Sequence, residues 1–256
     1  MQLIDTHAHL YLEQFDKDRT LAVKRALESG VTHMLLPNVD EATISSMMQL
    51  HSSFPGNCIP MMAIHPTSVT KDYARQLDNI ERQLENHQFC AIGESGIDLY
   101  WDKTFFKEQC IAFEKHIELA VNFDLPLVIH SRNSLNEIFD ILQNNRDKNL
   151  RGVFHCFPGN TGQAHEVIDL GFMIGVGGVV TFKNSTIAKV VENIGLEHIL
   201  LETDAPYLAP VPKRGKRNES SYLVYIAEKI ANIKKADVNE VASVTSKNAI
   251  DVFKLK

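Results

Sequence analysis

Histidines and acids recur in this chain at the ends of apolar segments, where they could bind metal ions. The apolar run that begins at Leu3 ends in His7 and His9, two residues apart. Because successive side chains of a strand alternate faces, both imidazoles would project to one side, close enough to bind one ion. Neutral imidazole is a good ligand for zinc, iron and manganese. Later apolar runs end in residues of the same kinds, namely His65, Glu94, His130, His155, Glu202 and Asp204.

Taken singly, each of these residues has a plain structural explanation. A lone strand histidine is usually hydrogen-bonded in the core, and an acid at a strand end often caps the next helix. Together, five histidines and three carboxylates match a site for two divalent ions with a bridging carboxylate. Such a site hydrolyses phosphoryl or carbonyl compounds with an activated water. Our candidate catalytic residues are Asp204, as metal ligand and general base, and Glu202, which would orient it from one layer below.

The spacing of the apolar runs predicts the scaffold. Eight runs end at positions 9, 38, 65, 94, 130, 155, 178 and 204, each followed by a helical pattern. Continuous apolar runs indicate strands covered on both faces, as in a parallel sheet. Steps of 23 to 36 residues match one βα unit, so we predict a (β/α)₈ barrel. An open doubly wound sheet is the alternative, but its G-x-G-x-x-G phosphate loop is missing after the first strand.

The end of the chain and the absence of a linker complete the fold prediction. Residues 1–256 are expected to form one α/β domain, a (β/α)₈ TIM barrel. An extra C-terminal helix over 237–253 would cover the barrel with Val241, Ala242, Ala249 and Phe253. In a barrel of this kind the strand carboxyl ends open on one face, where active sites lie. The histidines and acids should therefore meet there.

Composition narrows the class of protein. The formal net charge is −6, which disfavours coating nucleic acid by bulk electrostatics but leaves room for a local basic patch. The four cysteines form no C-x-x-C pair and are expected to be reduced thiols, as in a cytoplasmic protein. No secretory segment opens the chain and no apolar stretch is long enough to span a bilayer, so we expect no membrane. Nothing indicates an obligate protein partner.

A basic loop follows Asp204. Four of the five residues from Lys213 to Arg217 are basic, which suits a phosphate or an anionic polymer at the mouth of the site, although a solvated surface loop explains them as well. Our candidates for substrate contacts are His65, Arg132 and Arg214. The aromatic residues after Glu94 could stack on bases or simply close the loop over the core, and these are Tyr100, Trp101 and Phe105.

The motifs as a set resemble the TatD family of metal-dependent hydrolases, over nearly the whole chain. They are IDTHAHL (4–10), IHP (64–66), IGESGID (92–98), IHSR (129–132), HCFPG (155–159), LETDAPYL (201–208) and RGKRNE (214–219). The resemblance implies that His7, His9, Glu94 and Asp204 hold one metal. It implies that Glu94, His130 and His155 hold a second, with Glu94 as the bridge. The family is associated with deoxyribonuclease activity, including exonucleolytic cleavage, with Mg²⁺ or similar ions.

Two positions depart from the family pattern. Ser95 stands where leucine is usual, and Ser220 replaces the proline of Asn-Glu-Pro, which could loosen the loop that meets substrate. Related barrels of the dihydroorotase and phosphotriesterase type bridge their metals with a carboxylated lysine, and Glu94 argues against that branch.

The metals and the substrate stay open at this stage. Four imidazoles favour Zn²⁺, Mn²⁺ or Fe²⁺ over Mg²⁺, which prefers oxygen ligands. The first hypothesis is a two-metal deoxyribonuclease that acts on single-stranded DNA or DNA ends. The alternatives are a hydrolase of a small ester, amide or phosphate and, less favoured, a non-catalytic protein that binds metal or nucleic acid.

Overall fold

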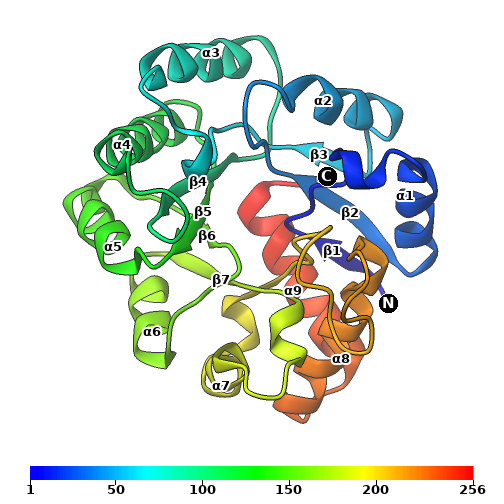
Figure 1. Ribbon diagram of the computed structural model, residues 1–256. Coiled ribbons are helices and arrows are strands. Elements are labelled where there is room, and N and C mark those ends of the chain that lie inside the picture. Colours follow the sequence, from blue (N-terminus) through cyan, green and yellow to red (C-terminus); the bar gives the residue numbers. More distant parts are fainter. Residues whose placement is uncertain (256) are drawn as a thin grey trace.

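The computed structural model describes residues 1–255 and contains a barrel of parallel strands inside a ring of helices (Figure 1). Hydrogen bonds of regular sheet join the first three strands to one another and the last five to one another. The strands within these residues are β1 (Leu3–Asp5), β2 (Val31–Leu36), β3 (Cys58–Pro60), β4 (Ile92–Asp98), β5 (Leu127–Arg132), β6 (Gly152–Phe154), β7 (Phe172–Val176) and β8 (Ile199–Leu201).

Backbone hydrogen bonds close the two sheets into a barrel. At one seam the N–H of Thr6 donates to the carbonyl of Leu201 at 3.0 Å, which joins the β1 and β8 segments. At the other the N–H of Cys90 donates to the carbonyl of Pro60 at 3.0 Å, just before β4 and at the end of β3. Neighbouring strands pair in parallel and in chain order throughout. The predicted (β/α)₈ barrel is therefore confirmed, and the open sheet is excluded.

Amphipathic helices cover the outside of the barrel. Helices α1 to α8 each follow a strand and bury an apolar stripe against the barrel, as α4 does with Phe113 and Ile117. No helix among residues 1–255 is both long and apolar enough to cross a bilayer. The helices are α1 (Arg19–Glu28), α2 (Ile44–Ser53), α3 (Tyr73–Asn86), α4 (Phe106–Asn122), α5 (Leu135–Asn144), α6 (Thr161–Asp169), α7 (Thr186–Asn193), α8 (Leu223–Lys234) and α9 (Val238–Phe253).

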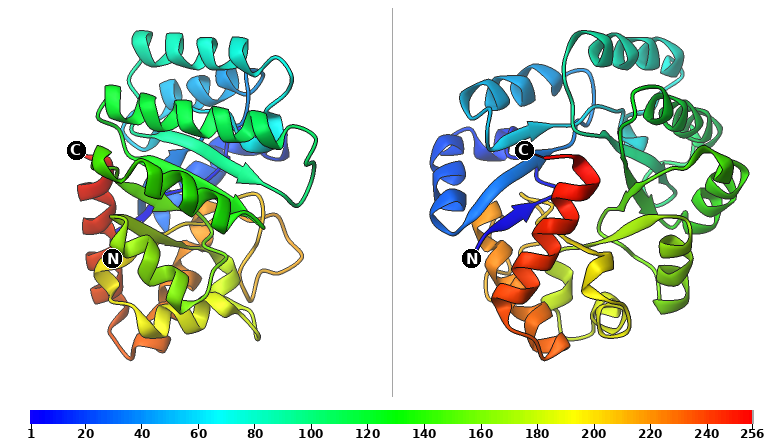
Figure 2. Two further views of the ribbon diagram at one scale, coloured as in Figure 1. Left: turned by 90° about the vertical axis from the view of Figure 1, so that its left-hand side faces the viewer. Right: turned by 180° about the vertical axis from the view of Figure 1, so that it is seen from behind.

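The extra C-terminal helix, α9, closes the floor of the barrel. Seen from behind, it crosses the amino-terminal ends of the strands (Figure 2). Its Ala249 and Phe253 join an apolar cluster inside the barrel. The other buried members of that cluster are Ile4, Leu35, Met61, Cys90, Ala91, Val128, Val153 and Leu200. The floor is thus apolar and sealed, which leaves the opposite end of the barrel for polar chemistry.

The strands end at positions other than the sequence suggested, and the differences at β1, β3 and β4 bear on the site. Strand β1 stops at Asp5, so His7 and His9 lie in an extended segment beyond it, where Ala8 still forms a bridge to Ala205. Strand β3 stops at Pro60, before an irregular stretch that leads to His65. Strand β4 runs on past Glu94 to Asp98. Apolar runs mark buried segments, but only hydrogen bonds decide where a strand stops.

The loop from β8 to α8 is anchored by ion pairs. Arg25 of α1 holds the buried carboxylate of Glu219 at 2.6 Å and that of Asp18 at 2.8 Å. Arg217 also pairs with Asp18, at 2.6 Å. The positive charge of Arg217 is therefore neutralised by Asp18, so Arg217 does not add to a free basic patch. The network anchors the end of this loop at Arg217 and Glu219, next to Ser220.

Replacement of Phe253 by alanine should lower the free energy of unfolding by about 3–5 kcal/mol, because it opens a cavity in the sealed floor. Urea unfolding followed by circular dichroism measures this change. Ile250, on the exposed side of the same helix, is the matched control. Ile250→Ala should change stability by less than about 0.5 kcal/mol. Equal effects at the two positions would show that α9 does not close the barrel.

Replacement of Arg25 by leucine should lower the free energy of unfolding at pH 7 by about 1–3 kcal/mol, because it leaves the carboxylate of Glu219 buried without its partner. Burial alone would raise the pKa of Glu219, but hydrogen bonds from Arg25 and Ser221 outweigh it and hold the pKa below 4.5. A lowered folded-state pKa adds stability above the unfolded pKa, and that stability is lost as the pH falls through the folded pKa.

The deficit of Arg25→Leu should therefore be complete at pH 7 and shrink below about pH 4.5, as Glu219 takes up a proton. Urea unfolding at a series of pH values measures it. Lys24→Leu, at an exposed position of the same helix, controls for the loss of a surface charge. A deficit that stayed constant from pH 7 to pH 3 would contradict the role given to Glu219.

Candidate metal centre

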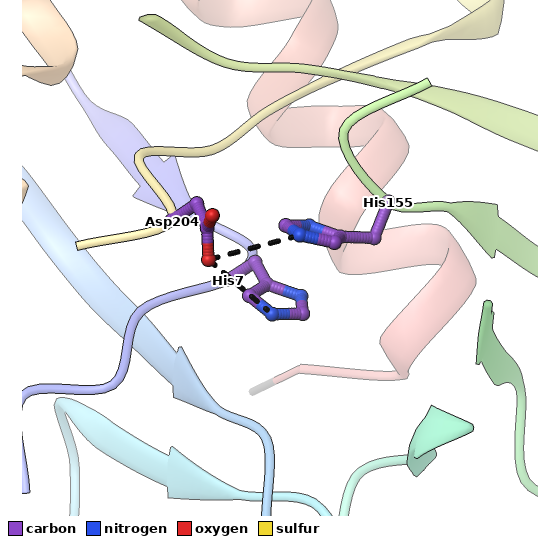
Figure 3. Close-up of side chains that lie close together, drawn as sticks. All are labelled: His7, His155 and Asp204. Carbon is purple, nitrogen blue, oxygen red and sulfur yellow. Dashed lines mark ion pairs between the residues drawn. The ribbon is translucent and has the colours of Figure 1, made fainter. Parts of the chain in front are cut away.

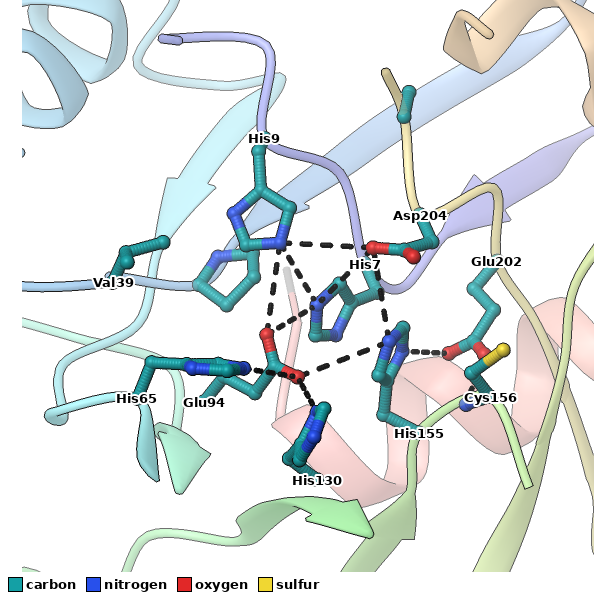
Figure 4. Close-up of polar contacts among 12 residues, drawn as sticks. His7, His9, Val39, His65, Glu94, His130, His155, Cys156, Glu202 and Asp204 are labelled. Carbon is teal, nitrogen blue, oxygen red and sulfur yellow. Dashed lines mark hydrogen bonds and ion pairs between the residues drawn. The ribbon is translucent and has the colours of Figure 1, made fainter. Parts of the chain in front are cut away.

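The carboxylate of Glu94 lies at the centre of the polar end of the barrel, between two groups of imidazoles (Figure 4). Its Oε2 atom lies 3.0 Å from Nε2 of His7 and 3.6 Å from Nε2 of His9. Its Oε1 atom lies 2.8 Å from Nδ1 of His130 and 3.5 Å from Nε2 of His65. The side chain of Glu94 is only 3% exposed. One carboxylate therefore faces two separate sets of nitrogen donors, as a bridging ligand does.

Asp204 and His155 complete the cluster on the β8 side (Figure 3). The Oδ1 atom of Asp204 lies 3.7 Å from Nε2 of His155 and 4.0 Å from Nε2 of His7. His155 also lies 3.9 Å from Oε1 of Glu94, so it stands between the two carboxylates. All six residues expected to bind metal are thus brought together. His65, expected to contact substrate, lies closer to Glu94 than His155 does and also has the geometry of a ligand.

Asp5 locks the two chain segments that carry His7 and Asp204. Its buried carboxylate accepts hydrogen bonds from the N–H of Thr203 at 2.9 Å and from the hydroxyl of Thr203 at 2.6 Å. The N–H of His7 donates to the same carboxylate at 3.3 Å. In addition, the N–H of Asp204 donates to the carbonyl of His7 at 2.9 Å. These bonds fix the β1 and β8 segments relative to each other, and so fix their side chains.

Glu202 contacts His155 rather than Asp204. Its carboxylate lies 3.0 Å from Nδ1 of His155 and accepts the N–H of Cys156 at 2.5 Å. Gly175 makes room for it, because a Cβ at that position would lie 2.7 Å from the carboxylate. The sequence expectation that Glu202 orients Asp204 from the layer below does not match this geometry. Asp204 has a left-handed backbone, with φ of 56°, which breaks the simple alternation of a strand.

Asp98 is a site residue that the sequence analysis did not single out. Its Oδ2 atom lies 2.9 Å from Nε2 of His130, whose other nitrogen faces Glu94. The spacing of Glu94 and Asp98 was a usable signal, because residues four apart on a strand share a face. The assumption that β4 ended at Glu94 hid it.

Four of the five imidazoles have their second nitrogen held by a neighbouring group. Partners of this kind fix the orientation and tautomer of a metal-binding histidine. The pairs are His9 with Tyr11 at 2.9 Å, His65 with Thr67 at 2.6 Å, His130 with Asp98 at 2.9 Å and His155 with Glu202 at 3.0 Å. For His7, the Nδ1 atom is buried and no residue among 1–255 hydrogen-bonds to it.

Protonation states in the cluster suit metal binding on the His7 side. Burial lowers the pKa of His7 well below its usual value and that of His9 to about 4, so both are neutral at pH 7. Burial opposes the charge on Glu94, but the surrounding histidines outweigh it and hold its pKa well below the ordinary range. Neutral imidazoles and an ionised carboxylate are the forms that ligate metal.

The carboxylates around His155, which follows β6, favour the protonated form of its imidazole. Burial would lower the pKa of His155, yet the carboxylates of Glu202 and Glu94 raise it to about 10. Burial raises the pKa of Asp204 to about 7. A cation that binds to His155 must therefore displace a proton.

The cluster lines a cavity of about 650 Å³ at the open end of the barrel. His65 and Arg132, two of the three expected substrate contacts, line it as well. Arg214 does not; its guanidinium stacks on Phe182 at 4.2 Å, beside a second hollow near β7 and α7. A contact of Arg214 with substrate stays a prediction, and the structure places Arg214 at the second hollow rather than in the lining of this cavity. The turns of the loop after Asp204 carry it to the neighbouring opening.

Comparisons with known proteins agree with the geometry. The "Uncharacterized metal-dependent hydrolase YabD" of Bacillus subtilis is 36% identical over 254 residues, which is 99% of each chain. The "3'-5' ssDNA/RNA exonuclease TatD" of Erwinia tasmaniensis is 29% identical over 99% of this chain and 100% of its own. The crystal structure of the TatD homologue YjjV of Escherichia coli superposes with a TM-score of 0.93, at 26% identity and 99% and 98% coverage. The family model "TatD related DNase" matches residues 4–254, and the chain belongs to this family of metal-dependent hydrolases.

Proposed function

We propose that the protein is a two-metal phosphodiesterase that removes nucleotides from the ends of single-stranded DNA. One observation carries the proposal: the two oxygens of the buried Glu94 face two different groups of histidines. A protein that only bound one metal ion would not need a bridging carboxylate. The two-ion arrangement is typical of enzymes that hydrolyse phosphate esters.

The chain offers two ligand groups that share Glu94. His7 and His9 would hold one ion with Glu94, and His65 and His130 lie within reach of a second ion at its other oxygen. Asp204 and His155 lie together beside His7, so Asp204 would complete the first group, and we assign His155 to the second ion on the family resemblance. The bound ions would supply Lewis acids that activate water and offset the negative charge of the phosphate. The many nitrogen donors favour Zn²⁺ or Mn²⁺ over Mg²⁺, which would act only at higher concentration.

Asp204 is our candidate for the group that accepts a proton from the attacking water. Its carboxylate lines the cavity and lies among the imidazoles, within reach of a water bound there. Burial raises its pKa to about 7, which suits a group that gains and loses a proton near neutral pH. Glu202, buried behind His155, would hold that imidazole in place without touching substrate.

DNA is the favoured substrate for two reasons. The chain is similar along its whole length to a relative named as an exonuclease of single-stranded DNA and RNA. Arg132 lines the cavity, and its guanidinium stacks on the ring of Tyr100, which leaves its N–H groups available for a phosphate. The barrel floor is closed by α9, so substrate has access from one end only, which favours a chain end over a continuous strand.

A small phosphate ester is the second candidate, because a cavity of about 650 Å³ holds one easily.

His130→Ala and removal of metal by EDTA should each lower nucleotide release from an end-labelled single-stranded oligonucleotide by roughly 100-fold or more. Adding back Zn²⁺, Mn²⁺ or Mg²⁺ separately should restore wild-type activity and identify the effective ion. His165→Ala, at an exposed position of α6, is the matched control and should retain full activity. Undiminished cleavage after EDTA treatment or in His130→Ala would refute the proposal. Faster turnover of a small phosphodiester than of any oligonucleotide would favour the second candidate.

Asp204→Asn and Glu202→Gln, both assayed at saturating metal, test the proposed proton acceptor and the residue that holds His155. Asp204→Asn is expected to lose roughly 100-fold or more in kcat. Glu202→Gln should weaken metal binding by about 10- to 100-fold, because the amide holds His155 without a charge. Calorimetric titration with Mn²⁺ and steady-state kinetics at saturating metal measure the two effects. If excess metal left Glu202→Gln as impaired as before, Glu202 would have a direct part in the chemistry.

A further inference from the structure

The loop after β4 places two exposed aromatic residues beside the metal centre. Trp101 is 69% exposed and Tyr100 is 52% exposed. Trp101 lines the same cavity as Glu94 and His130. Large aromatic side chains rarely remain this exposed unless they serve recognition. Trp101 is also the only tryptophan of the chain.

Asp98 connects this loop directly to the metal centre. Its Oδ1 atom accepts the N–H of Tyr100 at 2.8 Å and the N–H of Trp101 at 3.1 Å. Its Oδ2 atom lies 2.9 Å from His130. One buried side chain therefore sets the position of the aromatic loop and of a ligand-forming imidazole together. The backbone of Trp101 is thereby held at a fixed place relative to the metal centre, which keeps the indole beside the cavity.

Arg132 completes the arrangement from the end of β5. Its guanidinium carbon lies 3.9 Å from the centre of the Tyr100 ring and 5.4 Å from that of Trp101. Stacking on an aromatic ring orients a guanidinium and leaves its N–H groups available. Arg132 lines the cavity as well. A flat apolar surface and a free cation thus stand next to each other, which matches a base and its phosphate.

We propose that Trp101 and Arg132 form a nucleotide subsite, in which the indole stacks on an unpaired base and the guanidinium binds the phosphate next to it. This inference rests on the proposed function and specifies how its substrate is held. Every base offers a π face, so the subsite accepts any sequence. In a duplex that face is covered by the neighbouring base pairs, so the subsite selects single strands or frayed ends. A small phosphate ester without an aromatic group would gain nothing from it.

Tryptophan fluorescence tests the subsite without any need for catalysis. Because Trp101 is the only tryptophan, the emission of the whole protein reports on this one ring. Titration of Asp204→Asn, loaded with Mn²⁺, with a short thymidine oligonucleotide should quench the emission in a saturable way. An oligonucleotide with the same phosphates and abasic sugars should quench little and bind more weakly. Equal quenching by the two, or none by either, would overturn the inference.

Steady-state kinetics of single variants, with Asp204 intact, provide a second test of the subsite. Trp101→Leu should raise KM for a single-stranded oligonucleotide by roughly ten-fold, with a smaller effect on kcat, because stacking holds substrate before the reaction. Trp101→Phe, which keeps an aromatic face, should recover most of the loss. Ile111→Ala, an exposed apolar residue on α4, should behave as wild type. An unchanged KM in Trp101→Leu would refute the subsite.

The two proposals fail in different ways. If the wild-type enzyme cleaves oligonucleotides while Trp101→Leu and the fluorescence titrations show no role for the base, the subsite is wrong and the nuclease stands. If the oligonucleotide quenches Trp101 but the metal-loaded wild type cleaves neither it nor any other DNA, the nuclease proposal is wrong and the subsite stands as a binding site.

Discussion

A buried carboxylate sets the main constraint on this molecule. Glu94 keeps its charge at the centre of the barrel, and an ionised carboxylate in such surroundings is costly unless other groups compensate it. Five imidazoles from four different strand ends surround it, and no local stretch of chain could supply them all. The barrel solves this problem because its parallel strands deliver their carboxyl ends to one ring. The fold is therefore the means by which distant residues reach one charge.

A layer of acidic side chains behind the imidazoles fixes the orientation of the metal-binding groups. Asp98 orients His130, Glu202 orients His155, and Asp5 ties the segment of His7 to the segment of Asp204. All three of these acids are buried, and of the three Asp98 also lines the cavity. Rigid ligands lose little entropy when they bind a metal, and they resist rearrangement when substrate enters. The polar end of the barrel is thus organised in two layers, in which imidazoles and Glu94 form the inner layer and the supporting acids form the outer one.

The sequence was sufficient for the barrel and for the inner layer, and insufficient for most of what supports them. Repeated βα spacing predicted the strands, and His or acid at their ends predicted the cluster. The acids behind it were harder to find, because Asp5 and Asp98 look like ordinary strand residues until hydrogen bonds are known. Glu202 was identified, but its partner was not, since the left-handed backbone at Asp204 turns the two side chains apart. The sequence suggested a basic patch that includes Arg214 and Arg217. It could not show that Arg214 stacks on Phe182 or that Arg217 pairs with Asp18.

The floor of the barrel adds stability at the end away from the chemistry. The cluster of imidazoles and carboxylates at the polar end contributes little to the free energy of folding, because each group loses its hydration when it is buried. The floor, in contrast, is an apolar cluster sealed by Ala249 and Phe253 of α9. Burial of that apolar surface stabilises the strands at their amino-terminal ends, away from the proposed metal-binding residues. The strand ends can therefore carry polar, closely spaced side chains that would destabilise a smaller domain. Helix α9 therefore supports the metal centre indirectly: it lies at the opposite end of the barrel, but it stabilises the strands that carry the ligands.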